Sequence, residues 1–147
     1  MRAIVQRVDS AQVEVDGEIT GAIERGLLIY LGAGKGDGEE ERGYVLSKIL
    51  DLRIFENDEG KMDRSVVDVG GALLVVSQFT LYGDVRKGRR PSFDGAMSPE
   101  EAERAYDVFV AEARATGIRV ETGRFRAMMK VTSTNDGPVT IWIDSAK

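Results

Sequence analysis

The first part of the chain is dominated by short stretches in which apolar and polar residues alternate. Residues 2–8, 12–16 and 19–23 follow this pattern, and Gly17 marks a turn before the last of them. Successive side chains of a strand point to opposite faces of a sheet. The alternation therefore predicts three strands that are each buried on one face.

Other apolar runs are continuous. Residues 27–31 form an unbroken apolar run, which is typical of a strand that is buried on both faces. Residues 72–81 give the strongest strand prediction, and alternation would place Ser77 on one face of its end and Gln78 on the other. Shorter strands are expected at residues 52–55, 118–122, 127–134 and 139–144.

Two segments have the spacing of amphipathic helices. Residues 39–50 begin with three acids and continue with an apolar stripe. The second segment begins with Ser98, Pro99 and Glu101, which suit an N-cap, a first helical position and the closing residue of a capping box. Gly117 is expected to end this helix.

Strands outnumber helices in this pattern, and the two helices interrupt the series of strands. We therefore expect an α/β fold, in which one domain over residues 1–147 combines two main helices with a mixed or antiparallel, barrel-like sheet. A domain of this size buries roughly 68–70% of its unfolded surface, so its core needs neither a disulfide nor a metal.

The composition removes several kinds of chemistry. The chain has no histidine and no cysteine, which excludes a Ser–His relay and the usual zinc ligand sets. Its carboxylates lack the spacing of a metal-binding loop, so we expect no metal and no cofactor. The glycine-rich residues 32–38 fail the spacing of both nucleotide-binding motifs and are interpreted as a flexible connection.

The net charge of −5, from 25 acids and 20 bases, argues against nonspecific binding to nucleic acid. One segment is locally basic, and it is either a solvated loop or a contact for RNA. No apolar stretch approaches the roughly 18 residues of a membrane span. We therefore expect a cytoplasmic protein without a membrane partner. The cations of the basic segment are Arg86, Lys87, Arg89 and Arg90.

Two segments, Ser-Gln-Phe-Thr-Leu at residues 77–81 and Asn-Asp-Gly-Pro-Val-Thr at 135–140, have candidate chemistry. A strand that leaves its ladder at the first segment would expose backbone N–H groups, which can stabilise an oxyanion. The pattern alone favours an ordinary strand end. The second segment is interpreted first as a tight turn before a strand.

Together the two segments resemble the signature motifs of D-aminoacyl-tRNA deacylases. The resemblance extends along the whole chain through shorter matches at residues 6–8, 26–28, 53–55, 59–62, 90–93 and 122–125. Two departures concern the rim of the expected pocket. Arg126 stands where the family usually has glycine or alanine, and residues 132–134 are more polar than is usual before the second motif.

The resemblance implies an ester hydrolase. Members of the family are homodimers that cleave the bond between a D-amino acid, or glycine, and the 3′ end of tRNA. By this analogy the Gly137–Pro138 peptide would be cis, and its turn would enter the pocket of the partner subunit. Two main-chain carbonyls would there exclude an L side chain. The expected partners are a second copy of the chain and an aminoacylated tRNA 3′ end.

The resemblance also assigns roles within the first motif. Backbone N–H groups of Phe79 and Thr80 would bind the ester carbonyl and its oxyanion. Ser77 and Gln78 would line the adenosine side of the site. The ribose 2′-hydroxyl would help to activate water, which fits a chain without histidine. A competing hypothesis makes Thr80 a covalent nucleophile, although its motif contains no base that could activate it.

Further residues receive roles in the same way, each with a simpler alternative. Arg7 would hold the turn by donating to a carbonyl, or it is an exposed cation at a strand end. Ala102, Phe125 and Met129 would shape the pocket for the terminal nucleotide. The alternative is helix packing for the alanine and core packing for the other two. The basic segment would contact the acceptor stem of the enzyme's tRNA, or would serve a non-catalytic dimer that binds RNA.

Overall fold

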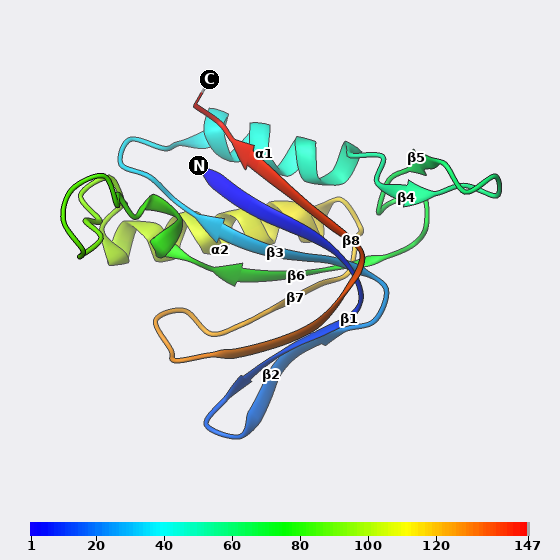
Figure 1. The fold of residues 1–147 in the computed structure, drawn as a ribbon, viewed down its shortest axis with the longest axis horizontal. Coiled ribbons are helices and arrows are strands. Elements are labelled where there is room, and N and C mark those ends of the chain that lie inside the picture. Colours follow the sequence, from blue (N-terminus) through cyan, green and yellow to red (C-terminus); the bar gives the residue numbers. More distant parts are fainter. Residues whose placement is uncertain (147) are drawn as a thin grey trace.

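The computed structural model describes residues 1–146, and its sheet is organised around one long strand. The first half of β1 (Arg2–Val15) pairs antiparallel with β3 (Gly26–Gly32), and the second half pairs with β2 (Glu18–Ile23). β8 (Lys130–Asp144) follows the other edge of β1 for most of its length (Figure 1). The two predicted strands at residues 2–8 and 12–16 are therefore one continuous strand.

Two parallel strands extend the sheet beyond β3. β6 (Ala72–Ser77) pairs with β3, and β7 (Val120–Thr122) pairs with β6. The strand order β2-β1-β3-β6-β7 nearly closes, because a Cβ on Gly21 of β2 would lie only 2.3 Å from the carbonyl oxygen of Thr122 in β7. This mixed, barrel-like sheet confirms the predicted fold class.

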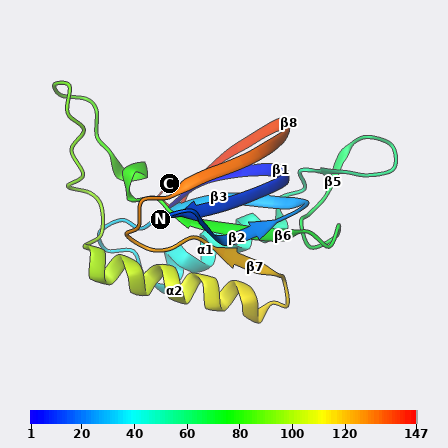
Figure 2. The same ribbon diagram turned by 90° about the horizontal axis from the view of Figure 1, so that it is seen from below.

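Both helices pack on the same face of this sheet (Figures 1 and 2). α1 (Glu39–Asp51) and α2 (Pro99–Ala115) cover a core that includes Phe109 and the alternate residues Leu27 and Ile29 of β3. The side chain of Leu28 points into the second core, inside the barrel. β3 is thus buried on both faces, as its apolar run predicts.

The remaining differences from the expected elements are small. The strand expected at residues 52–55 is instead the hairpin of β4 (Phe55–Glu56) and β5 (Met62–Arg64). Ser98 does precede α2 and Pro99 begins it, but the serine side chain makes no capping hydrogen bond, so the predicted capping box is wrong. None of the helices within residues 1–146 is long and apolar enough to cross a membrane.

The prediction that the strand at residue 72 continues to Leu81 is wrong. The Gln78 N–H makes the last bond to the neighbouring strand, donating to the Leu31 carbonyl at 2.8 Å. The chain then turns into the 3-10 helix η1 (Phe79–Tyr82), in which the Leu81 N–H donates to the Gln78 carbonyl at 3.2 Å. β3 ends at Gly32, so the chain beyond Gln78 has no neighbouring strand to pair with on that side.

Candidate active site

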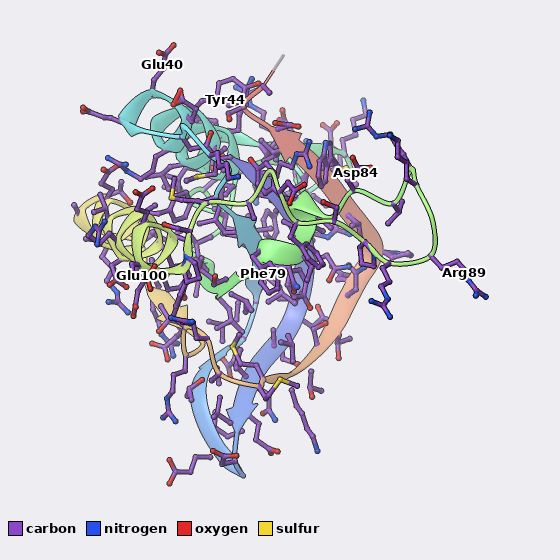
Figure 3. All side chains as sticks on the ribbon, turned by 90° about the vertical axis from the view of Figure 1, so that its left-hand side faces the viewer. Glu40, Tyr44, Phe79, Asp84, Arg89 and Glu100 are labelled. Carbon is purple, nitrogen blue, oxygen red and sulfur yellow. The ribbon has the colours of Figure 1, made fainter. Side chains whose placement is uncertain are left out.

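The 3-10 helix η1 places the first motif directly after β6, just beyond the C-terminal end of that strand (Figure 3). Neither the Phe79 N–H nor the Thr80 N–H donates a hydrogen bond within the described part of the chain. The Phe79 ring is 56% exposed and meets the Phe93 ring edge-on, with ring centroids 5.0 Å apart. The side-chain amide of Gln78 donates to the Thr80 hydroxyl, and no acid or base faces that hydroxyl in these contacts.

Arg2 holds η1 from its other end. Its Nη1 donates to the Leu81 carbonyl at 3.0 Å, and its guanidinium lies 4.4 Å from the centre of the Tyr82 ring. Its Nε donates to Asp144 Oδ2 at 3.1 Å, which ties η1 to the end of β8. Burial, and next the nearby Asp37 carboxylate, raise the pKa of Tyr82, so its hydroxyl stays neutral. Arg2 could not be recognised as a site residue from the sequence, because a cation at the start of a strand has no distinctive pattern.

A cavity of about 860 Å³ opens beside η1 and extends to the start of α2 and the loop that precedes β8. Its lining is mainly apolar, and Arg126 is the one charged side chain among the residues that line it. Seven of the residues singled out in the sequence come together here, from the β6 end, η1, α2 and the loop. They are Ser77, Gln78, Phe79, Thr80, Ala102, Phe125 and Met129.

Tyr106 separates this cavity from the core. Its hydroxyl donates to the Val75 carbonyl at 2.6 Å, and burial, followed by the charge of Asp107, raises its pKa. The ring of Phe125 lies 6.1 Å from that of Tyr106. Phe125 and Met129 are partly buried against the two cores and also line the cavity. Each residue therefore fits both of its predicted alternatives, core packing and pocket lining.

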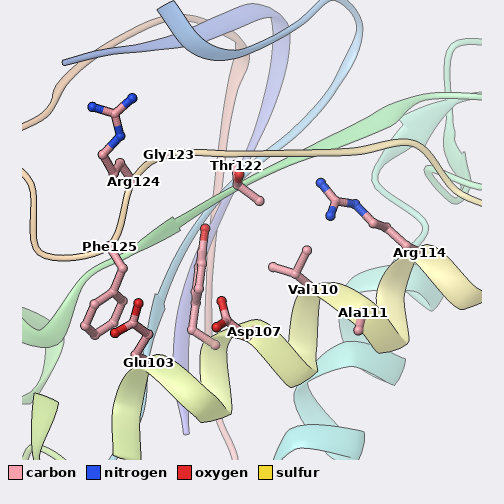
Figure 4. Close-up of a pocket in the computed structure, with 10 residues that line it drawn as sticks. Glu103, Asp107, Val110, Ala111, Arg114, Thr122, Gly123, Arg124 and Phe125 are labelled. Carbon is pink, nitrogen blue, oxygen red and sulfur yellow. The ribbon is translucent and has the colours of Figure 1, made fainter. Parts of the chain in front are cut away.

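A second groove, of about 680 Å³, lies between α2 and residues 122–125, and it shares Tyr106 and Phe125 with the cavity. Figure 4 shows Glu103 and Asp107 on the helix side of this groove and Arg124 on the loop side. The two arginines of the loop therefore line different depressions, with Arg124 at the groove and Arg126 at the cavity.

The second motif is a wide bulge within β8, so the predicted tight turn between two strands is wrong. Thr140 pairs with Gln6 and Asn135 pairs with Val8, which leaves residues 136–139 opposite Arg7 alone. The Gly137–Pro138 peptide is cis, as the resemblance implied, and Gly137 has a φ of 123°. Both residues are exposed, so the bulge projects from the sheet.

Arg7 is buried behind the bulge and is only 6% exposed, so the alternative of an exposed cation is wrong. Its Nη1 donates to the Ile54 carbonyl at 2.7 Å, a carbonyl outside the turn. Its Nε lies 3.1 Å from Asp136 Oδ2, but the angle is too poor for a hydrogen bond, and the contact is ionic only. The guanidinium thus supports the bulge through Asp136.

The bulge and the cavity lie at different ends of the sheet. β6 ends at the left of Figure 1, whereas β8 bends near its label at the right. Through the pairing of β1, β3 and β6, Arg7 is level with Leu73, four residues before Ser77. Four residues span about 13 Å along a strand, and three strand spacings add about 14 Å across the sheet. Neither Gly137 nor Pro138 lines the cavity of its own chain.

The basic segment lies on a loop that extends from η1 away from the rest of the molecule (Figures 2 and 3). Arg86 forms hydrogen bonds to both carboxylate oxygens of Asp84, which lower the pKa of that carboxyl to about 2. Lys87, Arg89 and Arg90 are exposed and have no ion-pair partner among residues 1–146. The free charge of the segment is therefore carried by three of its four cations.

The chemistry of the cavity comes from its backbone donors and its shape. Within residues 1–146, no three acidic side chains gather as they would around a metal ion. Free N–H groups at the mouth of an apolar cavity suit the stabilisation of an oxyanion in a water-poor setting. The fold and the cavity thus define a class of barrel-like α/β hydrolase that works without histidine.

Comparison with known proteins specifies this class. The model of the D-Tyr-tRNA(Tyr) deacylase family matches residues 4–144. A D-aminoacyl-tRNA deacylase of Koribacter versatilis (strain Ellin345) is 63% identical over 147 residues, which are 100% of this chain and 99% of the relative. One of Sorangium cellulosum (strain So ce56) is 59% identical over 148 residues, with the same coverage. The chain belongs to the D-Tyr-tRNA(Tyr) deacylase family and is therefore an enzyme.

Two solved structures have the same fold. The c-Myc DNA Unwinding Element Binding Protein superposes with a TM-score of 0.95 at 44% identity and covers 100% of both chains. A probable eukaryotic D-amino acid tRNA deacylase superposes with a TM-score of 0.82 over 97% of this chain and 98% of its own. The second is only 20% identical, so its likeness concerns the fold alone.

Proposed function

We propose that the enzyme hydrolyses the ester bond of D-aminoacyl-tRNA, and of mischarged glycyl-tRNA, and so releases the amino acid and free tRNA. The main support is the cavity, which brings the first motif, α2 and the loop before β8 together beside two free backbone N–H groups. The names of the relatives, D-aminoacyl-tRNA deacylases at 59–63% identity over the full chain, support the same substrate.

In this proposal the N–H groups of Phe79 and Thr80 bind the ester carbonyl oxygen as it becomes an oxyanion. One such donor supplies about 2.7–4 kcal/mol of transition-state stabilisation. Among residues 1–146, no carboxylate lines the cavity, and Tyr106 is held neutral, which fits activation of the water by the ribose 2′-hydroxyl next to the ester. Ser77 and Gln78 line the adenosine side, while Ala102, Phe125 and Met129 shape the pocket.

The proposal makes the enzyme a homodimer in which the Gly137–Pro138 bulge of one chain enters the cavity of the other. The carbonyl oxygens of the bulge then occupy the space that an L side chain would need, whereas a D side chain or glycine does not meet them. Two features support this arrangement. The bulge is exposed, and it lies too far from the cavity of its own chain to line it.

The extended loop supplies the contact with the acceptor stem through Lys87, Arg89 and Arg90. Exposed cations bind phosphates without regard to sequence, which suits an enzyme that accepts many tRNAs. Because Arg86 is paired with Asp84, it contributes less. We also propose that the enzyme is cytoplasmic, because its proposed substrate is aminoacyl-tRNA.

The test is the rate of amino-acid release from D-tyrosyl-tRNA, glycyl-tRNA and L-tyrosyl-tRNA by the purified protein. We expect release from the first two, while the L ester decays only at its spontaneous rate. Equal hydrolysis of the two enantiomers would refute selection by exclusion. Tight binding of tRNA with no release from any substrate would instead support the non-catalytic RNA-binding dimer.

A further inference from the structure

Arg126 is an unusual residue at the cavity. It is the one charged side chain among the residues that line the cavity, and it is exposed. No hydrogen bond or ion pair engages it within residues 1–146. Its backbone has a φ of 61°, a left-handed conformation that costs a residue with a side chain about 1–2 kcal/mol. A position that favours glycine thus carries an unpaired guanidinium at a ligand cavity.

We propose that Arg126 binds the phosphate that precedes the terminal nucleoside of the tRNA substrate. This inference rests on the proposed function and adds a residue to it. It makes Arg126 a substrate-binding residue for the phosphodiester, separate from the groups that act on the ester. The left-handed backbone is then tolerated because it directs the guanidinium to the mouth of the cavity.

The chemistry of the two partners is complementary. A guanidinium is always charged and presents its N–H donors in a planar fork that matches two phosphate oxygens. The other side chains of the cavity are apolar or uncharged, so they suit a nucleoside rather than a phosphate. Phe125 directly precedes Arg126 and lines the same cavity, so a base beside its ring leaves the 5′-phosphate within reach of the arginine.

Arg124 provides a matched control on the same loop. It is also exposed and has no ion-pair partner among the described residues, but it lines the second groove together with Glu103, Asp107 and Arg114 (Figure 4). Glu103 and Asp107 offset the charges of Arg124 and Arg114 in that groove, so it has no net positive charge to attract a phosphate. A general effect of charge on the loop would therefore involve both arginines, whereas the proposed contact involves Arg126 alone.

The experiment compares two small substrates, 3′-O-D-tyrosyl-adenosine and the same ester with a 5′-phosphate. We expect the wild-type enzyme to prefer the phosphorylated ester by about 10-fold in kcat/KM, the size of one charge-assisted contact. Arg126→Gln and Arg126→Gly should abolish the preference, mainly by raising the KM of the phosphorylated ester. Arg124→Gln should keep the preference.

Arg126→Gly also guards against misfolding, because glycine adopts the left-handed conformation without strain. The inference is overturned if the preference survives in Arg126→Gly, or if the wild-type enzyme cleaves both esters equally. It is also overturned if Arg124→Gln loses the preference to the same extent. A wild-type enzyme that cleaves neither these esters nor D-tyrosyl-tRNA would refute the proposed function itself.

Discussion

The cavity beside η1 and the bulge in β8 are complementary regions at different ends of one sheet. The cavity has a mainly apolar lining and free backbone donors, and Gly137 and Pro138 are not among the residues that line it. The bulge presents exposed backbone at Gly137 and Pro138, but no cavity of its own chain receives it. In the proposed function these are the two parts of one selective site, and a single chain does not bring them together.

The two regions also differ in how they are held. η1 is fixed from outside the cavity, by the contact of Arg2 with the Leu81 carbonyl and the Tyr82 ring. The bulge is fixed from behind, by the buried Arg7 and its contact with Asp136. In each region a guanidinium positions backbone rather than substrate. Backbone groups are chemically uniform, so their direction must be set by such neighbours.

The largest effect is expected from Gly137→Ala in the bulge. A Cβ at Gly137 would lie 2.7 Å from a methyl carbon of Val139 and 3.0 Å from the Val139 nitrogen, so the bulge must shift. We expect cleavage of L-tyrosyl-tRNA to rise by about 100-fold, since a displacement of this kind costs about 1–3 kcal/mol. Gly117→Ala is the control, because Gly117 also has a positive φ of 93° but has open space around its Cβ position. If Gly137→Ala leaves the ratio of D-ester to L-ester cleavage unchanged, the bulge does not select the enantiomer.

A smaller effect is expected from Ala102→Leu, which fills the cavity. Leucine has nearly the helix propensity of alanine, so α2 should be preserved. Crowding of the pocket should lower kcat/KM for D-tyrosyl-tRNA by about 30-fold, in line with an overpacking cost of about 1–3 kcal/mol. Ala111→Leu, at the second groove beside the same helix, should retain activity. If both variants behave alike in the kinetic assay, the cavity is not the substrate site.

Arg2→Gln should lower kcat by about 10-fold while KM changes by less than about twofold, because the bond of Arg2 to the Leu81 carbonyl positions the donors of η1. Arg2→Lys should recover part of the activity, since it keeps the charge but not the planar stack on Tyr82. The control is Arg53→Gln, which removes an exposed ion pair with Asp63. If the loss of kcat in Arg2→Gln is accompanied by a matching loss of thermal stability, the role of Arg2 is structural only.

The smallest effect is expected from Thr80→Ala. The proposed role of this residue belongs to its backbone N–H, and its hydroxyl only accepts a bond from Gln78. Activity on D-tyrosyl-tRNA should therefore fall by less than about threefold, as measured in single-turnover reactions. A loss of several orders of magnitude would instead restore Thr80 as a covalent nucleophile.

The sequence predicted the barrel-like sheet, both helices and the members of the cavity better than it predicted their local geometry. Alternation and apolar runs report burial, so β3 and its two buried faces could be recognised. The switch to η1 could not, because it depends on β3 ending at Gly32. The burial of Arg7 was also invisible, since Ile54 and Asp136 approach it only in the folded chain.

The central claim is that a neighbouring chain supplies the barrier against the L enantiomer. The most direct test is to mix the Gly137→Ala and Ala102→Leu proteins in equal amounts and to let their subunits exchange. Every working cavity then belongs to a Gly137→Ala chain, and in a symmetric dimer about half of these cavities face an intact bulge. We predict that cleavage of L-tyrosyl-tRNA per working cavity falls by about half on mixing, while cleavage of D-tyrosyl-tRNA is retained. Cleavage of the L ester that equals the sum of the two separate variants would contradict the account.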